Sequence, residues 1–90
     1  MIRIELYEGA RTLAGVDAVE VEAATLGEAL AALAARHPAL APRVIDGDRP
    51  ATHWRVNRNG DAFVDDPATP LTAGDTILVV TALAGGYRVP

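Results

Sequence analysis

The fold is decided near the end of the chain, where residues 74–86 read GDTILVVTALAGG. The Gly-Asp pair favours a turn, and the run from Thr76 to Leu83 is β-branched and continuously apolar. Such a run is typical of a strand that is covered on both faces, so we expect a central, buried strand here. Gly85 and Gly86 follow this strand directly, and glycine adopts extended and left-handed backbone conformations at little steric cost.

Two half-buried strands are predicted at the start of the chain. Residues 2–6 and 19–22 alternate apolar with charged side chains, which is the two-residue period of a strand with one buried face. The short separation between them, with a turn expected around residues 9–15, favours an antiparallel hairpin. The opening residues lack the uninterrupted apolar stretch of a secretory signal, and we therefore expect a cytoplasmic protein.

One main helix is predicted after this hairpin. Thr25 and Glu28 form a capping box, because the hydroxyl and the carboxylate can satisfy backbone N–H groups that the helix start leaves unpaired. Helix entry is expected near Leu26, and apolar residues at i, i+3 and i+4 spacing give the helix one apolar face. Pro38 is expected to end it.

A second hairpin is predicted before the final strand. Residues 54–58 and 61–64 are typical of short strands, and Asn59-Gly60 between them can take the positive φ angles of a tight turn. Residues 39–52 contain proline, glycine and aspartate without periodicity, so we expect a connecting loop with room for a short helical turn. The whole pattern predicts an α+β fold in which one main helix packs across a mixed sheet.

Composition limits the chain to one domain and excludes several classes of function. The 90 residues leave room for one modest core, and no run approaches the roughly 20 apolar residues of a membrane span, so we expect a soluble protein. The net charge of -4 repels phosphate backbones and the eight arginines are scattered, so nucleic-acid binding is not expected. The chain has no cysteine and no lysine, which makes it a conceivable donor in conjugation but a poor acceptor.

Four features in register resemble the MoaD/ThiS family of ubiquitin-like sulfur carriers. They are the opening strand, the capped leucine-rich helix, Val56-Asn57 with the hairpin after it, and the stretch LTAGDTI at residues 71–77. The match closes with LAGG at residues 83–86, where members of that family carry their functional diglycine. The resemblance implies a β-grasp domain over residues 1–84 and a flexible tail over residues 85–90.

The resemblance implies a protein co-substrate rather than an enzyme. An ATP-dependent, E1-like partner would adenylate the Gly86 carboxylate, and a sulfur donor would convert the acyl adenylate to a thiocarboxylate that a sulfur-accepting synthase consumes. Ala84 and Gly85 would thread the narrow channel of the partner, where bulk at either glycine position would block entry. ATP would be used by the partner, and the chain itself would hold no cofactor and no metal.

Residues 87–90 depart from the pattern of the family. They lock the Gly86 carbonyl in an amide that cannot be adenylated, so the carrier interpretation requires cleavage between Gly86 and Tyr87. Some carriers in this family resemble precursors that a JAMM-type metalloprotease clips, and we hypothesise the same processing here. The alternative is a β-grasp binding module that has lost carrier function and keeps its tail permanently.

The pathway and the docking residues stay open at this stage. The carrier would supply sulfur either as the small subunit of molybdopterin synthase or to thiamine, cysteine or a specialised metabolite, and the extension favours a dedicated biosynthetic carrier. Phe63 and Leu83 are candidates for a hydrophobic docking patch, although each suits the core equally well.

Several polar and aromatic residues are assigned no chemistry. His37 and His53 have no cysteine or well-spaced carboxylate beside them, so surface or structural roles are expected. Asp65-Asp66 stands before a proline and is typical of a solvated turn. Trp54 begins a strand and is expected to pack at the edge of the core.

Overall fold

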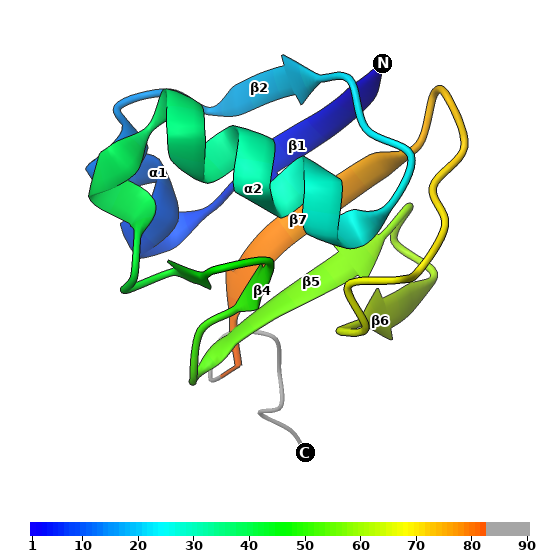
Figure 1. The fold of residues 1–90 in the computed structure, drawn as a ribbon. Coiled ribbons are helices and arrows are strands. Elements are labelled where there is room, and N and C mark those ends of the chain that lie inside the picture. The colour runs from blue at the N-terminus through cyan, green and yellow to red at the C-terminus, as the bar shows by residue number, and fades with distance from the viewer. Residues whose placement is uncertain (83–90) are drawn as a thin grey trace.

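A five-stranded mixed sheet organises the computed structural model, which describes residues 1–82 (Figure 1). β1 (Ile2–Leu6) pairs antiparallel with β2 (Ala18–Val21) and parallel with β7 (Thr76–Thr81). β7 in turn pairs antiparallel with β5 (Trp54–Arg58), which pairs with the edge strand β6 (Ala62–Val64). The strand order is β2-β1-β7-β5-β6, so the final strand is central, as the sequence predicts.

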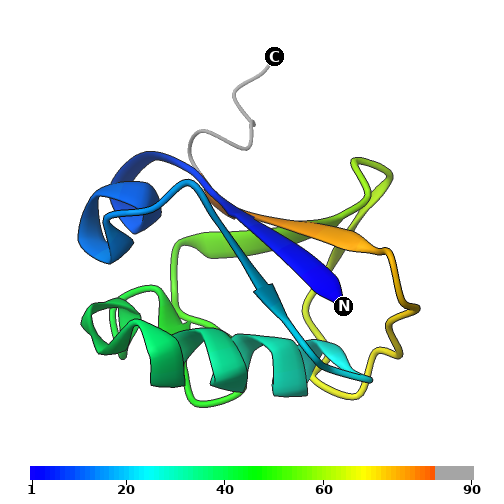
Figure 2. The ribbon, with the colours of Figure 1, turned by 90° about the horizontal axis from the view of Figure 1, so that it is seen from above.

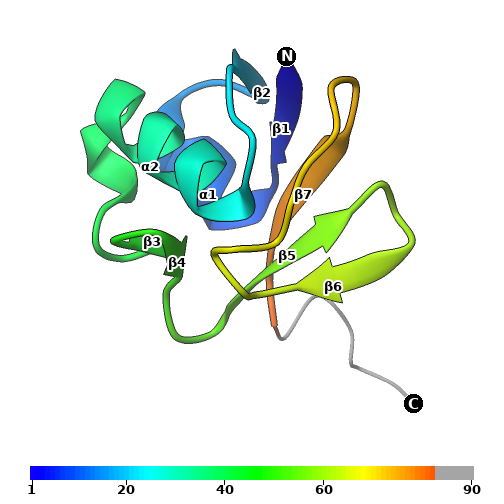
Figure 3. The same ribbon diagram turned by 45° about the vertical axis from the view of Figure 1, so that its right-hand side comes forward.

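Helices cover one face of this sheet and one of its ends. α2 (Leu26–Arg36) crosses the face, and a 3-10 turn, η1 (Pro38–Leu40), follows it immediately (Figures 1 and 2). α1 (Glu8–Ala14) lies in the connection between β1 and β2. A separate two-stranded sheet pairs β3 (Ile45–Asp46) with β4 (Arg49–Pro50) beside α2 (Figure 3). The predicted α+β fold with one main helix across a mixed sheet is confirmed.

The start of α2 follows the predicted capping box. The Thr25 hydroxyl accepts a hydrogen bond from the Glu28 N–H at 3.2 Å, and the Glu28 carboxylate accepts one from the Ala24 N–H at 2.8 Å. The Glu28 carboxylate therefore accepts from the backbone N–H of the residue before the N-cap, and not from the N–H of the N-cap residue Thr25. The helix ends at Arg36 and Pro38 opens the 3-10 turn, in agreement with the expected stop.

The core fills the space between α2 and the sheet. Most inward positions of β1, β2, β5 and β7 and the apolar face of α2 are buried, as the two-residue and helical periods predict. The connection after α2 adds further apolar side chains to the same cluster. Its largest fully buried members are Ile2, Ile4, Leu6, Leu26, Leu30, Leu33, Leu40, Val44, Ile45, Val56, Ile77 and Val79.

One sequence prediction on the turns is wrong, and one on the connection after α2 is incomplete, because the expected short helical turn is present as η1 but the hairpin was not predicted. Residues 9–15, expected as a turn, lie mostly in α1, a seven-residue helix that buries only Ala10 and ends at Gly15 in a left-handed conformation (φ 77°). So short a helix depends on its packing against η1 and β7 rather than on its own sequence, and it leaves little periodicity to detect. Residues 39–52 contain the β3–β4 hairpin, whose strands of two residues each carry no period at all.

The expectation that the final strand is covered on both faces is also wrong. Ile77 and Val79 are buried beneath α2, but Leu78 and Val80 are only half-buried on the opposite face. Within residues 1–82, α2 stands on the other side of the sheet and nothing forms a second layer here (Figure 2). The continuous apolar run thus places apolar side chains on a face that the described residues leave open.

The segment between β6 and β7 packs closely on the start of α2. The Gly27 N–H donates to the Pro67 carbonyl and the Leu26 N–H donates to the Thr69 carbonyl, both at 2.9 Å. A Cβ atom on Gly27 would lie 3.0 Å from the Pro67 Cβ and 3.1 Å from its carbonyl oxygen. The absence of a side chain at Gly27 is therefore what lets this segment satisfy the first N–H groups of the helix.

Candidate functional site

The residues predicted to carry the chemistry lie outside the described part of the chain. Ala84, Gly85, Gly86, the bond to Tyr87, and the proposed docking residue Leu83 all fall within residues 83–90. The structure describes the point from which this segment continues, namely the last residues of β7 and Ala82. We call this point the tail root.

The opposite end of β7 is fixed by a network of polar side chains. The Asp75 carboxylate accepts hydrogen bonds from the Asn59 amide at 3.0 Å and the Thr72 N–H at 2.9 Å, and it pairs with Arg58 at 3.2 Å. The Asn59 amide oxygen in turn accepts from the Thr76 N–H at 2.8 Å. The hydrogen bonds to Asp75 lower its pKa below the usual value, and the bond from Asn59 contributes most. The carboxylate is therefore charged at neutral pH.

Both turns in this network were recognised in the sequence, but their connection was not. Asn59 and Gly60 take φ angles of 56° and 74°, as predicted for the tight turn. The bond from Asn59 to Asp75 joins residues 16 positions apart. Because the pairing of β5 with β7 creates this contact, local turn signals give no indication of it.

The tail root is held from both sides. The Thr81 hydroxyl donates to the Glu8 carboxylate at 3.0 Å, and the Ala82 N–H donates to the His53 carbonyl at 2.7 Å. Glu8 and His53 have φ angles of 54° and 74°, a left-handed conformation that costs roughly 1–2 kcal/mol for a residue with a side chain. The two strained residues thus meet the chain where it leaves the sheet, and they fix the position from which residues 83–90 continue.

An apolar surface lies beside the tail root, on the face of the sheet that no other element within residues 1–82 covers. We define the docking face as Phe63 of β6, Arg55 of β5, and Leu78 and Val80 of β7. Leu78 and Val80 are half-buried, and Phe63 is 43% exposed. Phe63 is therefore a surface residue and not part of the core, while its docking role stays a prediction.

Arg55 covers the aromatic ring of this surface. Its guanidinium carbon lies 4.1 Å from the centroid of the Phe63 ring, within the range of a cation–π contact. Within residues 1–82 no carboxylate comes within ion-pair distance of Arg55. The docking face therefore combines apolar side chains with a cation that has an aromatic partner and, among the described residues, no acidic one.

On the same face of the sheet, the polar side chains of β1 and of Tyr7 after it pair with one another. The Tyr7 hydroxyl donates to the Glu5 carboxylate at 2.6 Å, and Arg3 pairs with the other carboxylate oxygen at 3.0 Å. Hydrogen bonding by Tyr7 and then Arg3 lowers the pKa of Glu5, and the Glu5 carboxylate raises the pKa of Tyr7. The charges of β1 thus pair with each other, which distinguishes this strip from Arg55.

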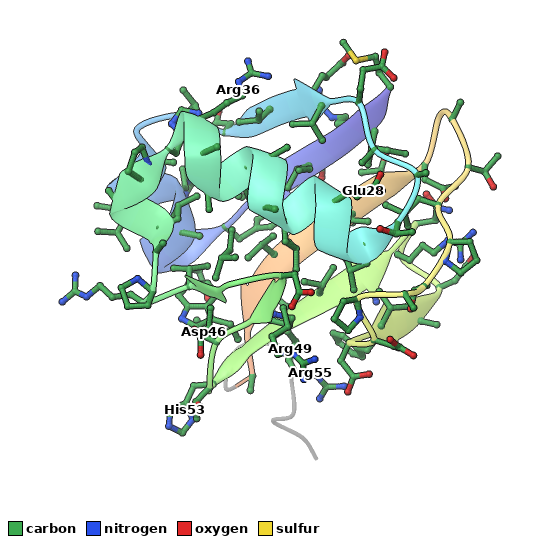
Figure 4. The ribbon with its side chains drawn as sticks, in the orientation of Figure 1. Glu28, Arg36, Asp46, Arg49, His53 and Arg55 are labelled. Atoms are coloured by element: carbon green, nitrogen blue, oxygen red, sulfur yellow. The ribbon has the colours of Figure 1, made fainter. Side chains whose placement is uncertain are left out.

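A groove borders the docking face at Arg55 and Phe63. It has a volume of about 540 Å³ and is lined by residues 49–55 and 63–67. Arg49, His53 and Arg55 line it from the segment around β5, and Figure 4 labels these three side chains. Asp65 and Asp66 contribute carboxylates from the segment after β6.

The remaining candidate residues have structural surroundings. The Asp66 carboxylate accepts the Ala68 N–H at 2.9 Å, which is the local turn expected for Asp65-Asp66. Trp54 is half-buried and packs against the core, as predicted. Within residues 1–82 no group of three acidic or histidine side chains is arranged to hold a metal ion, and no helix is both long and apolar enough to span a membrane.

Comparison with known proteins gives matches over nearly the whole chain. The model of a family described as the ThiS family matches residues 4–86. Small archaeal modifier protein 1 of Haloferax volcanii is 37% identical over 86 residues, which covers 91% of this chain and 97% of that protein. A crystal structure of SAMP1 from Haloferax volcanii has a TM-score of 0.79 at 33% identity, covering 94% of this chain and 98% of that one.

A further structure supports the fold alone. The crystal structure of the BexX/CysO complex of Amycolatopsis orientalis contains a chain that matches with a TM-score of 0.76 at 24% identity, covering 96% of this chain and 100% of that chain. At that identity the likeness concerns the arrangement of the mixed sheet and its helices. The β-grasp arrangement implied by the sequence resemblance is thereby confirmed.

Proposed function

The chain belongs to the ThiS family of ubiquitin-like sulfur-carrier and modifier proteins, and from this premise we propose that it carries sulfur on the carboxylate of Gly86. The observation that carries the proposal is the family match, which extends through residue 86 and so includes the diglycine. The fixed tail root supports it, because it holds the start of this segment beside an open surface.

The proposed chemistry takes place on the chain but is catalysed by partners. A Gly86 carboxylate oxygen attacks the α-phosphate of ATP in an E1-like enzyme, and pyrophosphate leaves. Sulfur from a donor then attacks the acyl carbon, and AMP leaves with the original oxygen. The net change replaces one carboxylate oxygen by sulfur, and the thiocarboxylate passes that sulfur to a synthase that makes a cofactor or metabolite.

Removal of residues 87–90 is the necessary first step. An amide nitrogen occupies the place of the carboxylate oxygen until the bond between Gly86 and Tyr87 is hydrolysed. We assign this hydrolysis to a JAMM-type metalloprotease, which adds one water across the bond and leaves Gly86 as the C-terminus. A chain that kept the extension would instead act as the permanent binding module considered above.

The docking face is proposed as the surface that the E1-like enzyme contacts. Two of its apolar side chains, Leu78 and Val80, lie on β7, the strand that leads to the tail root, so a partner bound there stands next to the start of the tail. Arg55 lacks an acidic partner within residues 1–82, and we expect the surface of the enzyme to supply a carboxylate beside an apolar patch. Leu83 would extend this surface but lies outside the described residues.

A second candidate function follows from the curated relative. Haloferax volcanii Small archaeal modifier protein 1 is named a modifier, and an adenylated Gly86 could equally be transferred to an amine of a target protein. The two candidates share the activation step and differ in the nucleophile that follows it. The choice between molybdopterin synthase and a dedicated biosynthetic carrier concerns only the later sulfur acceptor.

Activation can be tested with purified components. The chain truncated after Gly86 is incubated with ATP and the E1-like enzyme of its host, and pyrophosphate release is measured, with the 90-residue chain as the matched control. We expect release from the truncated chain alone. Equal absence of release from both chains would refute the carrier proposal and favour the permanent binding module.

A further inference from the structure

Asn57 is a polar residue in the middle of the docking face. It stands two positions after Arg55 on β5, and Val56 between them is buried beneath α2, so Asn57 points to the same side of the sheet as Arg55. In the register of the sheet, Asn57 is paired with Phe63 of β6 and with Leu78 of β7. Side chains directly opposite each other on neighbouring antiparallel strands are about 5 Å apart, so the amide lies between two apolar side chains.

The side-chain oxygen of Asn57 is buried but accepts no hydrogen bond within residues 1–82. In this part of the chain it is the one buried side-chain oxygen or nitrogen atom without a partner. Nearly all buried polar atoms in folded proteins are hydrogen-bonded, because an unpaired atom loses its bonds to water and gains none in return. Elsewhere on the same face, the side chains of Glu5 and Tyr7 bond to each other. The oxygen of Asn57 is therefore an exception within this structure.

The stability of the protein does not explain the asparagine. A leucine at this position would fill a similar volume, leave no polar atom unpaired, and join Phe63 and Leu78 in one apolar row. Replacing a buried polar group by an apolar group of the same shape is often neutral or stabilising. Positions where a sequence departs from the stabilising choice are expected at functional sites. The unpaired amide of Asn57 therefore points to a bond that forms only with a partner.

Two surface side chains lie next to this amide. Phe63, directly opposite Asn57, is 43% exposed, and the guanidinium carbon of Arg55 lies 4.1 Å from the centroid of its ring. A charge-assisted hydrogen bond from an arginine to a carboxylate is stronger than a cation–π contact at an exposed site. A partner that presents a carboxylate can therefore draw Arg55 away from the ring and open access to the amide.

We propose that Asn57 is a specificity-determining residue of the docking face, and that its unpaired oxygen accepts a hydrogen bond from the partner. The inference rests on the proposed docking of the E1-like enzyme and states the chemistry of the surface that fits. That surface carries a carboxylate for Arg55 and an N–H or O–H donor for Asn57, within an apolar contact. A protein that lacks the donor leaves the oxygen buried and unpaired, so it binds more weakly.

The first part of the test needs no partner. Asn57→Leu removes the unpaired amide, and Asn59→Gly is the matched control because the Asn59 amide is bonded to Asp75 and Thr76. Glycine also adopts the φ angle of 56° at position 59 without strain. In urea unfolding of the 90-residue chain, we expect the midpoint of Asn57→Leu to equal or exceed that of wild type, and that of Asn59→Gly to fall. A midpoint of Asn57→Leu below that of wild type would show that the amide is already bonded in the folded chain, and would overturn the proposal.

The second part measures binding of the chain truncated after Gly86 to the E1-like enzyme of its host by calorimetry. We expect Asn57→Leu to weaken binding about tenfold although it enlarges the apolar surface, because the donor of the enzyme is then buried without an acceptor. Equal or tighter binding would show that apolar contact alone governs docking, which would overturn this inference and leave the docking face intact. Failure of the wild-type chain to bind would instead refute the docking face itself, so the two failures are distinguishable.

Discussion

Replacing Gly27 by alanine should destabilise the protein, although a glycine-to-alanine change in a helix usually stabilises it. Glycine inside a helix costs roughly 1 kcal/mol relative to alanine, so Gly→Ala ordinarily stabilises. At Gly27 the added Cβ would lie 3.0 Å from the Pro67 Cβ, 3.1 Å from the Pro67 carbonyl oxygen and 3.3 Å from the Asp48 Cβ. Two of these neighbours belong to a segment held to α2 by backbone hydrogen bonds, so they cannot withdraw without weakening those bonds.

The magnitude follows from the competition between these two effects. Overpacking a close contact costs roughly 1–3 kcal/mol, which exceeds the gain in helix propensity, and we expect Gly27→Ala to lower the free energy of unfolding by about 1 kcal/mol. Gly9 in α1 provides the matched control, because a Cβ there would meet Trp54 at an ordinary 3.7 Å. Gly9→Ala should raise the free energy of unfolding by roughly 0.5–1 kcal/mol.

Urea unfolding followed by far-ultraviolet circular dichroism measures both changes. The midpoint should move to lower urea for Gly27→Ala and to higher urea for Gly9→Ala, with the slope of the transition unchanged. If Gly27→Ala stabilises the protein as much as Gly9→Ala does, the account of how residues 65–73 pack on α2 is wrong.

Three further predictions concern the cap, the β7 anchor and the docking face. Thr25→Ala removes the hydroxyl that accepts from the Glu28 N–H and should cost about 1 kcal/mol in urea unfolding; no loss would contradict the capping contact. Because the folded pKa of Asp75 lies below its usual 3.8, its stabilising effect is present at neutral pH and is lost as the pH falls through the lowered folded value. Asp75→Asn should therefore have a lower melting temperature than wild type at neutral pH, and the difference between the two melting temperatures should narrow below pH 3.8. A melting-temperature difference that stays constant with pH would refute this assignment. Phe63→Ala should weaken binding to the E1-like enzyme about tenfold in calorimetry, whereas Val16→Ala, also exposed, should not change it; equal affinities for all three proteins would remove Phe63 from the docking face.

Much of the fold could be predicted from the sequence, because its signals are local. The alternation in residues 2–6, the capping box at Thr25 and the Asn59-Gly60 turn each specify a nearby backbone conformation, and the structure contains all three. α1 and the β3–β4 hairpin were missed because they are too short for a period and depend on tertiary packing.

The open face of β7 shows a different limit. A continuous apolar strand indicates burial on both sides, but a strand with one face in the core and an apolar protein-binding surface on the other produces the same pattern. The sequence therefore could not distinguish Leu78 and Val80 as surface residues. The contacts of Glu8 and His53 at the tail root were equally hidden, because they join residues distant in the sequence.

The measurement that tests the central claim most directly is the intact mass of the protein isolated from its native host, under non-reducing conditions that preserve thiocarboxylates. The account predicts a species that ends at Gly86, together with one heavier by the difference between a sulfur and an oxygen atom. A single species that retains residues 87–90 during sulfur-demanding growth would contradict it and identify the chain as a permanent binding module.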